Sequence, residues 1–214
     1  MINGITLKVC GITSVNDAVS AAGVGADYLG FILHPSSPRH VSEAKFARMA
    51  PMLPLAKRVA VVVQPEVETL KRLATLGFDV FQVHFDATTP PDEIRAWADA
   101  VKPRQLWLAP RLPANEEVKA EWIELADAIL MDTFHADKVG GTGQTGDWSK
   151  FKRHVAAHPQ KTWILAGGLN PENINTAINA TDALFVDVNS GVEESPGVKS
   201  QEKLFALWRA LERL

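Results

Sequence analysis

Residues 163–188 read WILAGGLNPENINTAINATDALFVDV, which is one complete strand–loop–helix–strand unit. An apolar run at 163–166 ends in two glycines, and a second apolar run lies at 184–188. Between them, Asn170 and Pro171 are typical of a helix N-cap and the first helical position. Apolar residues then recur at helical spacing. The segment therefore predicts two parallel strands joined by a helix.

The same unit repeats along the whole sequence. Further apolar runs lie at 5–9, 28–33, 58–63, 80–84, 105–109 and 128–131. Helical patterns follow at 14–22, from Ser42, after Pro65, at 91–101, at 115–125, from Trp148 and from Ser200. The strand runs are apolar at consecutive positions, as in parallel sheets that are buried under helices. Eight such units predict an α/β fold, a single (β/α)₈ TIM barrel in which residues 1–214 form one catalytic domain.

The main alternative to the closed barrel is an open, doubly wound sheet. Dinucleotide-binding sheets of that class carry Gly-x-Gly-x-x-Gly after the first strand. This sequence has Cys10, Gly11, Ile12 and Thr13 at that place. No linker or low-complexity segment divides the chain, so we favour the closed barrel.

The composition limits the classes of function. The 214 residues are 46% hydrophobic and 22% charged, with a formal net charge of −3. No strong basic surface is therefore expected to bind nucleic acid or an anionic membrane. Cys10 is the only cysteine, which excludes an internal disulfide and a cysteine-based zinc site. No signal peptide or membrane-spanning run is evident, so the sequence predicts a soluble, cytoplasmic protein.

Two reactive side chains fall at the C-terminal ends of predicted strands, where barrels of this kind carry out their chemistry. Cys10 ends the first strand and Asp132 follows the sixth, so the two can face each other across the barrel mouth. A thiol is mostly protonated at neutral pH and needs a cationic neighbour or a charged substrate to act as a base. Lys8 shares a strand face with Cys10 and either supplies that charge or pairs with a carboxylate. A buried, unreactive thiol is the structural alternative.

Asp132 is a candidate general acid. An inward carboxylate at the barrel mouth is partly desolvated, which raises its pKa and lets it keep a proton to donate. A loop or capping carboxylate is the structural alternative. The glycine-rich loop that follows, which includes Gly141, is either a turn or a mobile loop that closes over a substrate.

The loops after the last two strands predict a phosphate site. Gly168 follows the seventh strand, and Ser190 and Gly191 follow the eighth, where this fold often binds phosphate. Glycines let backbone N–H groups approach an anion, and a helix N-terminus adds partial positive charge. No Lys or Arg lies between residues 166 and 198. We therefore expect backbone amides to bind the phosphate.

Arg39 lies in the loop after the second strand, where its planar guanidinium would suit a carboxylate. A solvated surface arginine is the alternative. His34, His135, His154 and His158 show no spacing typical of metal ligands, so no metal site is predicted.

Taken in order, the sequence motifs resemble those of the phosphoribosylanthranilate isomerases. They are KVCGIT (8–13), GFI (30–32) with SPR (37–39), QVH (82–84), Asp132 with GGTG (140–143) and DW (147–148), AGGLNP (166–171) and DVNSGVE (187–193). The resemblance covers nearly the whole chain. Two positions depart from the family pattern: Phe85 replaces a usual glycine, and Gly146 replaces a usual aromatic residue. The first affects the expected geometry around His84, and the second affects an apolar contact of the loop.

The resemblance implies an Amadori rearrangement of N-(5′-phosphoribosyl)anthranilate in tryptophan biosynthesis, with no cofactor or metal. We expect a monomer or weak homodimer. It implies that Cys10 is the base and Asp132 the acid. It implies substrate-binding roles for Arg39, His84, Gly141, Gly168, Asp187, Ser190 and Gly191. Among these, Arg39 would bind the anthranilate carboxylate, and Asp187 would orient the sugar or the anthranilate amine.

Two other functions remain open from the sequence. A histidine-pathway aminoaldose isomerase usually works with two carboxylates, which Cys10 at the first strand end disfavours. A non-catalytic phosphosugar-binding barrel would keep the glycine loops without needing both Cys10 and Asp132.

Overall fold

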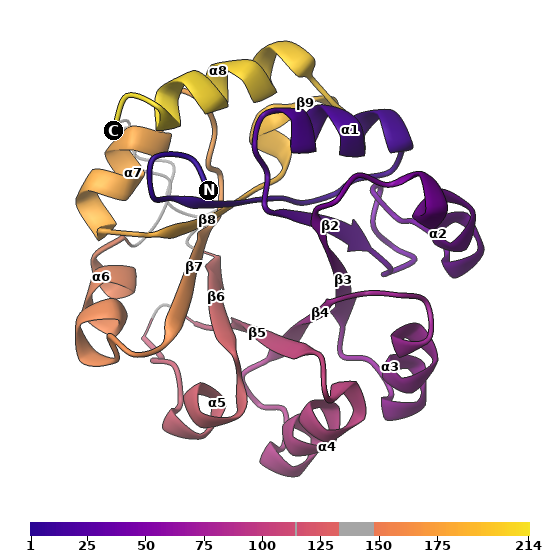
Figure 1. Cartoon of the computed structure of the whole chain (residues 1–214). Coiled ribbons are helices and arrows are strands. Elements are labelled where there is room, and N and C mark those ends of the chain that lie inside the picture. The colour runs from indigo at the N-terminus through magenta and orange to yellow at the C-terminus, as the bar shows by residue number, and fades with distance from the viewer. Residues whose placement is uncertain (114, 133–147) are drawn as a thin grey trace.

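The computed structural model describes residues 1–113, 115–132 and 148–214. Eight parallel strands close into a barrel in chain order, and helices form a ring outside it (Figure 1). The strands are β1 (Thr6–Val9), β2 (Tyr28–Ile32), β3 (Lys57–Val63), β4 (Val80–Asp86), β5 (Gln105–Arg111), β6 (Ala128–Asp132), β7 (Thr162–Ala166) and β8 (Phe185–Val188). The closed barrel is confirmed, and the open sheet is wrong.

One helix follows each strand. These are α1 (Val15–Gly23), α2 (Glu43–Met49), α3 (Val67–Ala74), α4 (Pro91–Val101), α5 (Ala120–Leu125), α6 (Trp148–Ala157), α7 (Ile174–Thr181) and α8 (Gln201–Leu211). Ser42 and Ser200, where the sequence patterns predict that two helices begin, cap α2 and α8, since each hydroxyl accepts a hydrogen bond from the backbone N–H three residues later. No helix within the described ranges is long and apolar enough to cross a membrane.

Three local features differ from the sequence-based expectation. Helix α5 begins at Ala120 rather than near residue 115. Helix α7 begins at Ile174, because the Asn170 side chain accepts hydrogen bonds from the N–H groups of Glu172 and Asn173 and holds a turn ahead of the helix. A short hairpin of β9 (Glu193–Ser195) and β10 (Val198–Lys199) follows the 3₁₀ turn Ser190–Val192, and the sequence patterns did not predict it.

Two apolar clusters make up the core. The larger lies between the strands and the outer helices, and the smaller fills the barrel interior. Tyr28, Trp107 and Phe185 pack against one another inside the barrel, with ring centroids 4.9–5.3 Å apart. Tyr28 and Phe185 are the first residues of β2 and β8, so this aromatic group fills the N-terminal end of the barrel. The opposite end is left for polar side chains.

Phe85 belongs to the outer core. Its ring makes edge contacts with Trp97 of α4 and Trp122 of α5, at centroid distances of 5.8 and 5.2 Å. Since neighbouring strand residues point to opposite faces, Phe85 faces the helices while His84 faces the barrel mouth. The departure from the family's glycine at this position therefore adds helix packing and does not fill the mouth.

Candidate active site

A cavity of about 330 Å³ opens at the C-terminal ends of the strands. Six of the predicted site residues line it: Cys10, His84, Asp132, Gly168, Asp187 and Ser190. Arg39 and Gly191 are not among its lining residues, and Gly141 lies outside the described residues. The fold thus brings both proposed acid–base residues and parts of both phosphate loops to one cavity.

Cys10 lies at the floor of this cavity, directly after β1. Its side chain is buried, and Gly30 of β2 makes room for it, since a Cβ at Gly30 would come within 2.9 Å of the Cys10 sulfur and 3.1 Å of the Lys8 side chain. Burial raises the pKa of the Cys10 thiol, and the charge of Lys8 offsets only part of this effect. In the free protein the thiol is therefore held mainly in its protonated form.

Lys8 pairs with a carboxylate, which is one of the two roles left open for it, and its charge also acts on Cys10. Its Nζ lies 2.8 Å from Oδ2 of Asp187, and the Lys8 side chain is fully buried. Burial alone would lower the pKa of Lys8, but Asp187 and Cys10 raise it above its usual value. The other Asp187 oxygen, Oδ1, is buried and has no hydrogen-bond partner among the described residues. Because Asp187 lines the cavity, this oxygen can accept a hydrogen bond from a ligand.

His84 is held as a neutral imidazole. Burial, together with the charges of Lys8 and Arg111, lowers its pKa to about 4. The Gln82 amide nitrogen lies 2.8 Å from His84 Nε2, so the amide can donate to an unprotonated Nε2. In that tautomer the proton is on Nδ1, and His84 can still donate one hydrogen bond.

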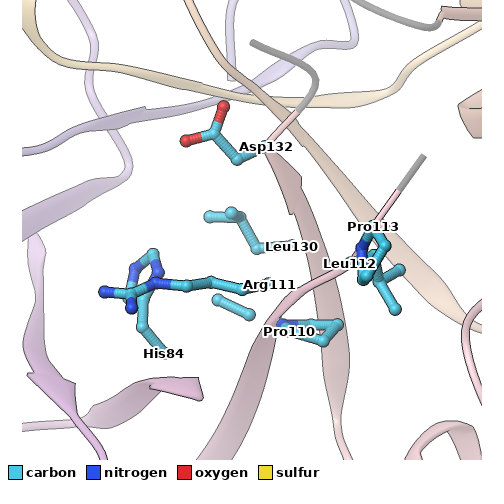
Figure 2. A pocket seen from close by; sticks show the side chains of 8 residues that line it. His84, Pro110, Arg111, Leu112, Pro113, Leu130 and Asp132 are labelled. Carbon is cyan, nitrogen blue, oxygen red and sulfur yellow. The ribbon is translucent and has the colours of Figure 1, made fainter. Parts of the chain in front are cut away.

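A second cavity, of about 370 Å³, adjoins the first and shares His84, Leu130 and Asp132 with it. Figure 2 shows Asp132 projecting from the end of β6 beyond Leu130, with His84 and Arg111 across the pocket and the prolines on its wall. Asp132 itself is exposed. The partial desolvation expected for its carboxylate is therefore not seen in the described residues. Its place between the two cavities still gives it access to a ligand in either.

The loop after β7 turns sharply at two glycines with positive φ, 99° at Gly167 and 62° at Gly168. Within the described part of the chain, the backbone N–H groups of Gly168, Ser190 and Gly191 donate to no acceptor. Those of Glu172 and Asn173, in the turn ahead of α7, already donate to the Asn170 side chain. The amides left for an anion are thus those of the two loops rather than those of this turn.

Gly191 has a steric role that the sequence did not reveal. A Cβ at this position would lie 2.0 Å from the Leu169 carbonyl oxygen and 2.8 Å from Asn170 Cβ. The glycine therefore lets the loop after β8 pack directly on the loop after β7. We expected Gly191 to allow an anion close to the backbone. In this structure it allows the backbone of the loop after β7 to come close to the loop after β8.

The Arg39 side chain is fixed by hydrogen bonds rather than solvated. Its Nε and Nη2 donate to both carboxylate oxygens of Glu193 at 2.7–3.1 Å, and its side chain is 18% exposed. It crosses Gly11, where a Cβ would come within 2.9 Å of Arg39 Cδ and 2.5 Å of Asn189 Oδ1. With φ at +73°, Gly11 is required both for the turn and for this close contact.

Two buried charged residues of the β9–β10 hairpin, Glu193 and Lys199, were not predicted as site residues from the sequence. Lys199 donates from Nζ to Glu193 at 2.9 Å and to the backbone and side-chain oxygens of Asn189 at 3.2 and 3.1 Å. In the sequence, Glu193 appears only as the last residue of the motif at 187–193, and Lys199 lies outside that motif. The residue types are informative only once the burial is known, because a buried Glu or Lys is rare unless it is paired.

The fold and the site together define a (β/α)₈-barrel protein with a thiol and a carboxylate at the mouth and backbone amides without a partner among the described residues in its last two loops. A sequence profile of the N-(5′-phosphoribosyl)anthranilate (PRA) isomerase family matches residues 7–210. The chain belongs to that family.

Individual relatives agree with this assignment over almost the full length. An N-(5′-phosphoribosyl)anthranilate isomerase of Synechococcus elongatus is 35% identical over 216 residues, covering 98% of this chain and 97% of the relative. The phosphoribosyl anthranilate isomerase structure from Thermus thermophilus is 34% identical, with a TM-score of 0.79 and coverage of 98% and 99%. A third, 28% identical over 98% of this chain and 100% of that one, has a TM-score of 0.76 and was solved with reduced 1-(o-carboxyphenylamino)-1-deoxyribulose 5-phosphate.

Proposed function

We propose that this protein isomerises N-(5′-phosphoribosyl)anthranilate to 1-(2-carboxyphenylamino)-1-deoxyribulose 5-phosphate, an Amadori rearrangement in tryptophan biosynthesis. The observation that carries the proposal is the single cavity that holds both Cys10 and Asp132 beside the amide-lined loops. The reaction opens the ribose ring and relocates protons within one molecule, with no external oxidant or reductant, so a general acid and a general base are sufficient for it.

In the first step, Asp132 donates a proton to the ring oxygen of the ribose. The C1′–O bond breaks, and the lone pair of the anthranilate nitrogen forms an iminium. The exposed position of Asp132 at the end of β6 lets its carboxyl group reach a sugar in the cavity. The same group can be reprotonated from solvent after each turnover.

In the second step, Cys10 removes the proton from C2′, and the electrons of that C–H bond form the enolamine. The enolamine then tautomerises to the ketone. The raised pKa of the buried thiol opposes this step in the free protein. A positive iminium next to the sulfur favours loss of the thiol proton to solvent, so the thiolate base forms only when substrate is bound, and the proton taken from C2′ restores the thiol.

The remaining site residues bind the two ends and the middle of the substrate. The N–H groups of Gly168, Ser190 and Gly191 bind the phosphate, with no cation required from these loops. Arg39 binds the anthranilate carboxylate through N–H groups that Glu193 does not use. Asp187 accepts a hydrogen bond at Oδ1 from the sugar or the anthranilate amine, and His84 donates one from its ring. Gly141, outside the described residues, is proposed to belong to the loop that covers the substrate.

A fluorescence assay of the purified protein tests the proposal. Consumption of N-(5′-phosphoribosyl)anthranilate, with formation of the deoxyribulose product, is the expected result. Turnover only of a histidine-pathway aminoaldose would favour the sibling isomerase. Tight binding of the reduced product analogue with no turnover of either substrate would favour a non-catalytic barrel.

We also propose that residues 1–214 act as one catalytic domain, as a monomer or weak homodimer in the cytoplasm. The supporting observation is chemical: the proposed base is the sole cysteine, and a reducing compartment keeps it a thiol. Sedimentation velocity over a hundredfold range of protein concentration would show a stable higher oligomer if this view of the assembly is wrong.

A further inference from the structure

Glu193 connects two loops of the barrel mouth through one buried carboxylate. Its side chain is 4% exposed. Arg39, from the loop after β2, donates two N–H groups to it, and Lys199 of β10 donates a third. Lys199 also binds both oxygens of Asn189, in the loop after β8. The network therefore links the proposed carboxylate-binding arginine to the loop that begins the proposed phosphate site.

We propose that Glu193 is a positioning residue that fixes Arg39 relative to the loop after β8, and so sets the spacing between the sites for the two anionic ends of the substrate. This inference rests on the proposed function, because it takes Arg39 as the group that binds the aromatic carboxylate. Glu193 itself touches neither substrate nor reacting atoms in this scheme.

The charges of the network favour binding of an anion. Two cations, Arg39 and Lys199, share the single carboxylate of Glu193, which leaves one positive charge in excess. The three Nζ protons of Lys199 are matched by three oxygens. Arg39 has five N–H donors, and Glu193 accepts from only two of its nitrogens. Within the described residues, Arg39 is thus the charged member of the network with donors left for a ligand.

The rigidity of the network also favours binding. An arginine side chain loses considerable rotamer freedom when it is fixed by a ligand. Here the bidentate contact with Glu193 and the packing over Gly11 fix the guanidinium before any ligand arrives. The burial of Glu193 would raise its pKa, but the hydrogen bonds from Arg39 and Lys199 lower it below its usual value, so the carboxylate stays charged.

The backbone of the hairpin has two anchors that do not involve the Glu193 carboxylate, besides the Gly197 N–H that donates to this carboxylate at 3.3 Å. Lys203 of α8 donates to the Glu193 carbonyl oxygen at 2.7 Å, and Thr13 donates to the Gly197 carbonyl oxygen at 2.6 Å. A change confined to the carboxylate therefore leaves these two anchors in place. This separation allows the positioning role to be tested apart from the folding of the hairpin.

The test compares two ligands, the reduced product analogue and its aniline counterpart without the aromatic carboxylate, by calorimetry. Glu193→Gln should weaken binding of the first ligand about tenfold, the scale of one lost charged contact. The dissociation constant of the second ligand should change by less than about twofold, because that ligand has no carboxylate to contact Arg39. Thr13→Val loosens the same hairpin without touching Arg39, and should leave the ratio of the two dissociation constants unchanged. Equal weakening of both ligands by Glu193→Gln, or no weakening of either, would overturn the proposal.

A double variant and a second substitution complete the design. If Glu193 acts through Arg39, then Arg39→Ala with Glu193→Gln should bind the carboxylate ligand no more weakly than Arg39→Ala alone, whereas additive losses contradict the proposal. Should Glu193→Gln fail to fold, Glu193→Asp keeps the charge but shortens its reach, and should likewise weaken binding of the carboxylate ligand relative to the aniline ligand. Ligand binding by a wild-type protein that does not turn over N-(5′-phosphoribosyl)anthranilate would reject the proposed function and leave the role of Glu193 measurable.

Discussion

Lys8 and Asp187 form a buried ion pair across the seam where the first strand meets the last. They are register partners on β1 and β8, and Nζ lies 2.8 Å from Oδ2. Their side chains are 0% and 8% exposed. The pair therefore joins the two ends of the sheet at the place where the barrel closes, directly beneath Cys10.

Replacing Lys8 by Met should destabilise the protein strongly. The Asp187 carboxylate would be left buried without its counter-charge, which typically costs about 3–5 kcal/mol. Urea denaturation would measure the free energy of unfolding. The matched control is Lys71→Met, which removes an exposed pair with Glu68 and should cost less than about 1 kcal/mol. Similar small losses for both variants would show that the buried pair does not stabilise the closed barrel.

Cys10→Ala and Asp132→Asn should each lower kcat by at least about 10²-fold, the usual scale for loss of a general acid or base. Both variants should still bind the reduced product analogue, because neither residue binds the phosphate or the carboxylate in our scheme. Steady-state kinetics and calorimetry would measure the two quantities. A kcat close to that of the wild type would remove the substituted residue from the mechanism.

The neutral state of His84 predicts a dependence of stability on pH. Its pKa falls from 6.5 in the unfolded chain to about 4 in the folded one. Between these values the unfolded chain binds more protons, so stability decreases as pH falls, by up to about 1.4 kcal/mol per pH unit from this group. His84→Gln should reduce that slope, and NMR should find the ring uncharged at pH 5.5. A ring that titrates near pH 6.5 would contradict the expectation.

Gly191→Ala should disturb the contact between the last two loops. Its Cβ would lie 2.0 Å from a backbone oxygen of Leu169, so the loops must separate, at a cost of about 1–3 kcal/mol for overpacking. The KM should rise as the phosphate site opens. Gly23→Ala, near the end of α1, adds a Cβ with nothing within 4 Å and should be neutral or slightly stabilising. Equal melting temperatures for the two variants would reject the steric role of Gly191.

Local patterns in the sequence were sufficient for the eight strands and for the starts of α2 and α8 at Ser42 and Ser200. They placed Cys10 and Asp132 at strand ends, because the C-terminal edge of a barrel follows from strand order alone. They could not identify the partners of the charged residues. Arg39 and Glu193 are 154 positions apart in the sequence, and Lys8 and Asp187 are 179 apart. Such pairs form only when the barrel closes, so the spacing of neighbouring residues in the sequence does not predict them.

The start of α7 shows a second limit. Asn170 before Pro171 reads as an N-cap, and the Asn170 side chain does accept backbone hydrogen bonds. Asn173 returns the contact by accepting from the Asn170 N–H, and this turn delays the helix to Ile174. The residue types were interpreted correctly, but the competition between a turn and a helix was decided by side-chain contacts that the pattern did not contain.

A crystal structure with reduced 1-(o-carboxyphenylamino)-1-deoxyribulose 5-phosphate would test the account of the site most directly. We expect the phosphate to accept hydrogen bonds from the backbone amides of Gly168, Ser190 and Gly191, with the ribulose chain between Cys10 and Asp132. The aromatic carboxylate should meet Arg39 while Arg39 keeps its contact with Glu193. A phosphate bound elsewhere in the mouth, with those three amides left unoccupied, would contradict the assignment of both ends of the substrate.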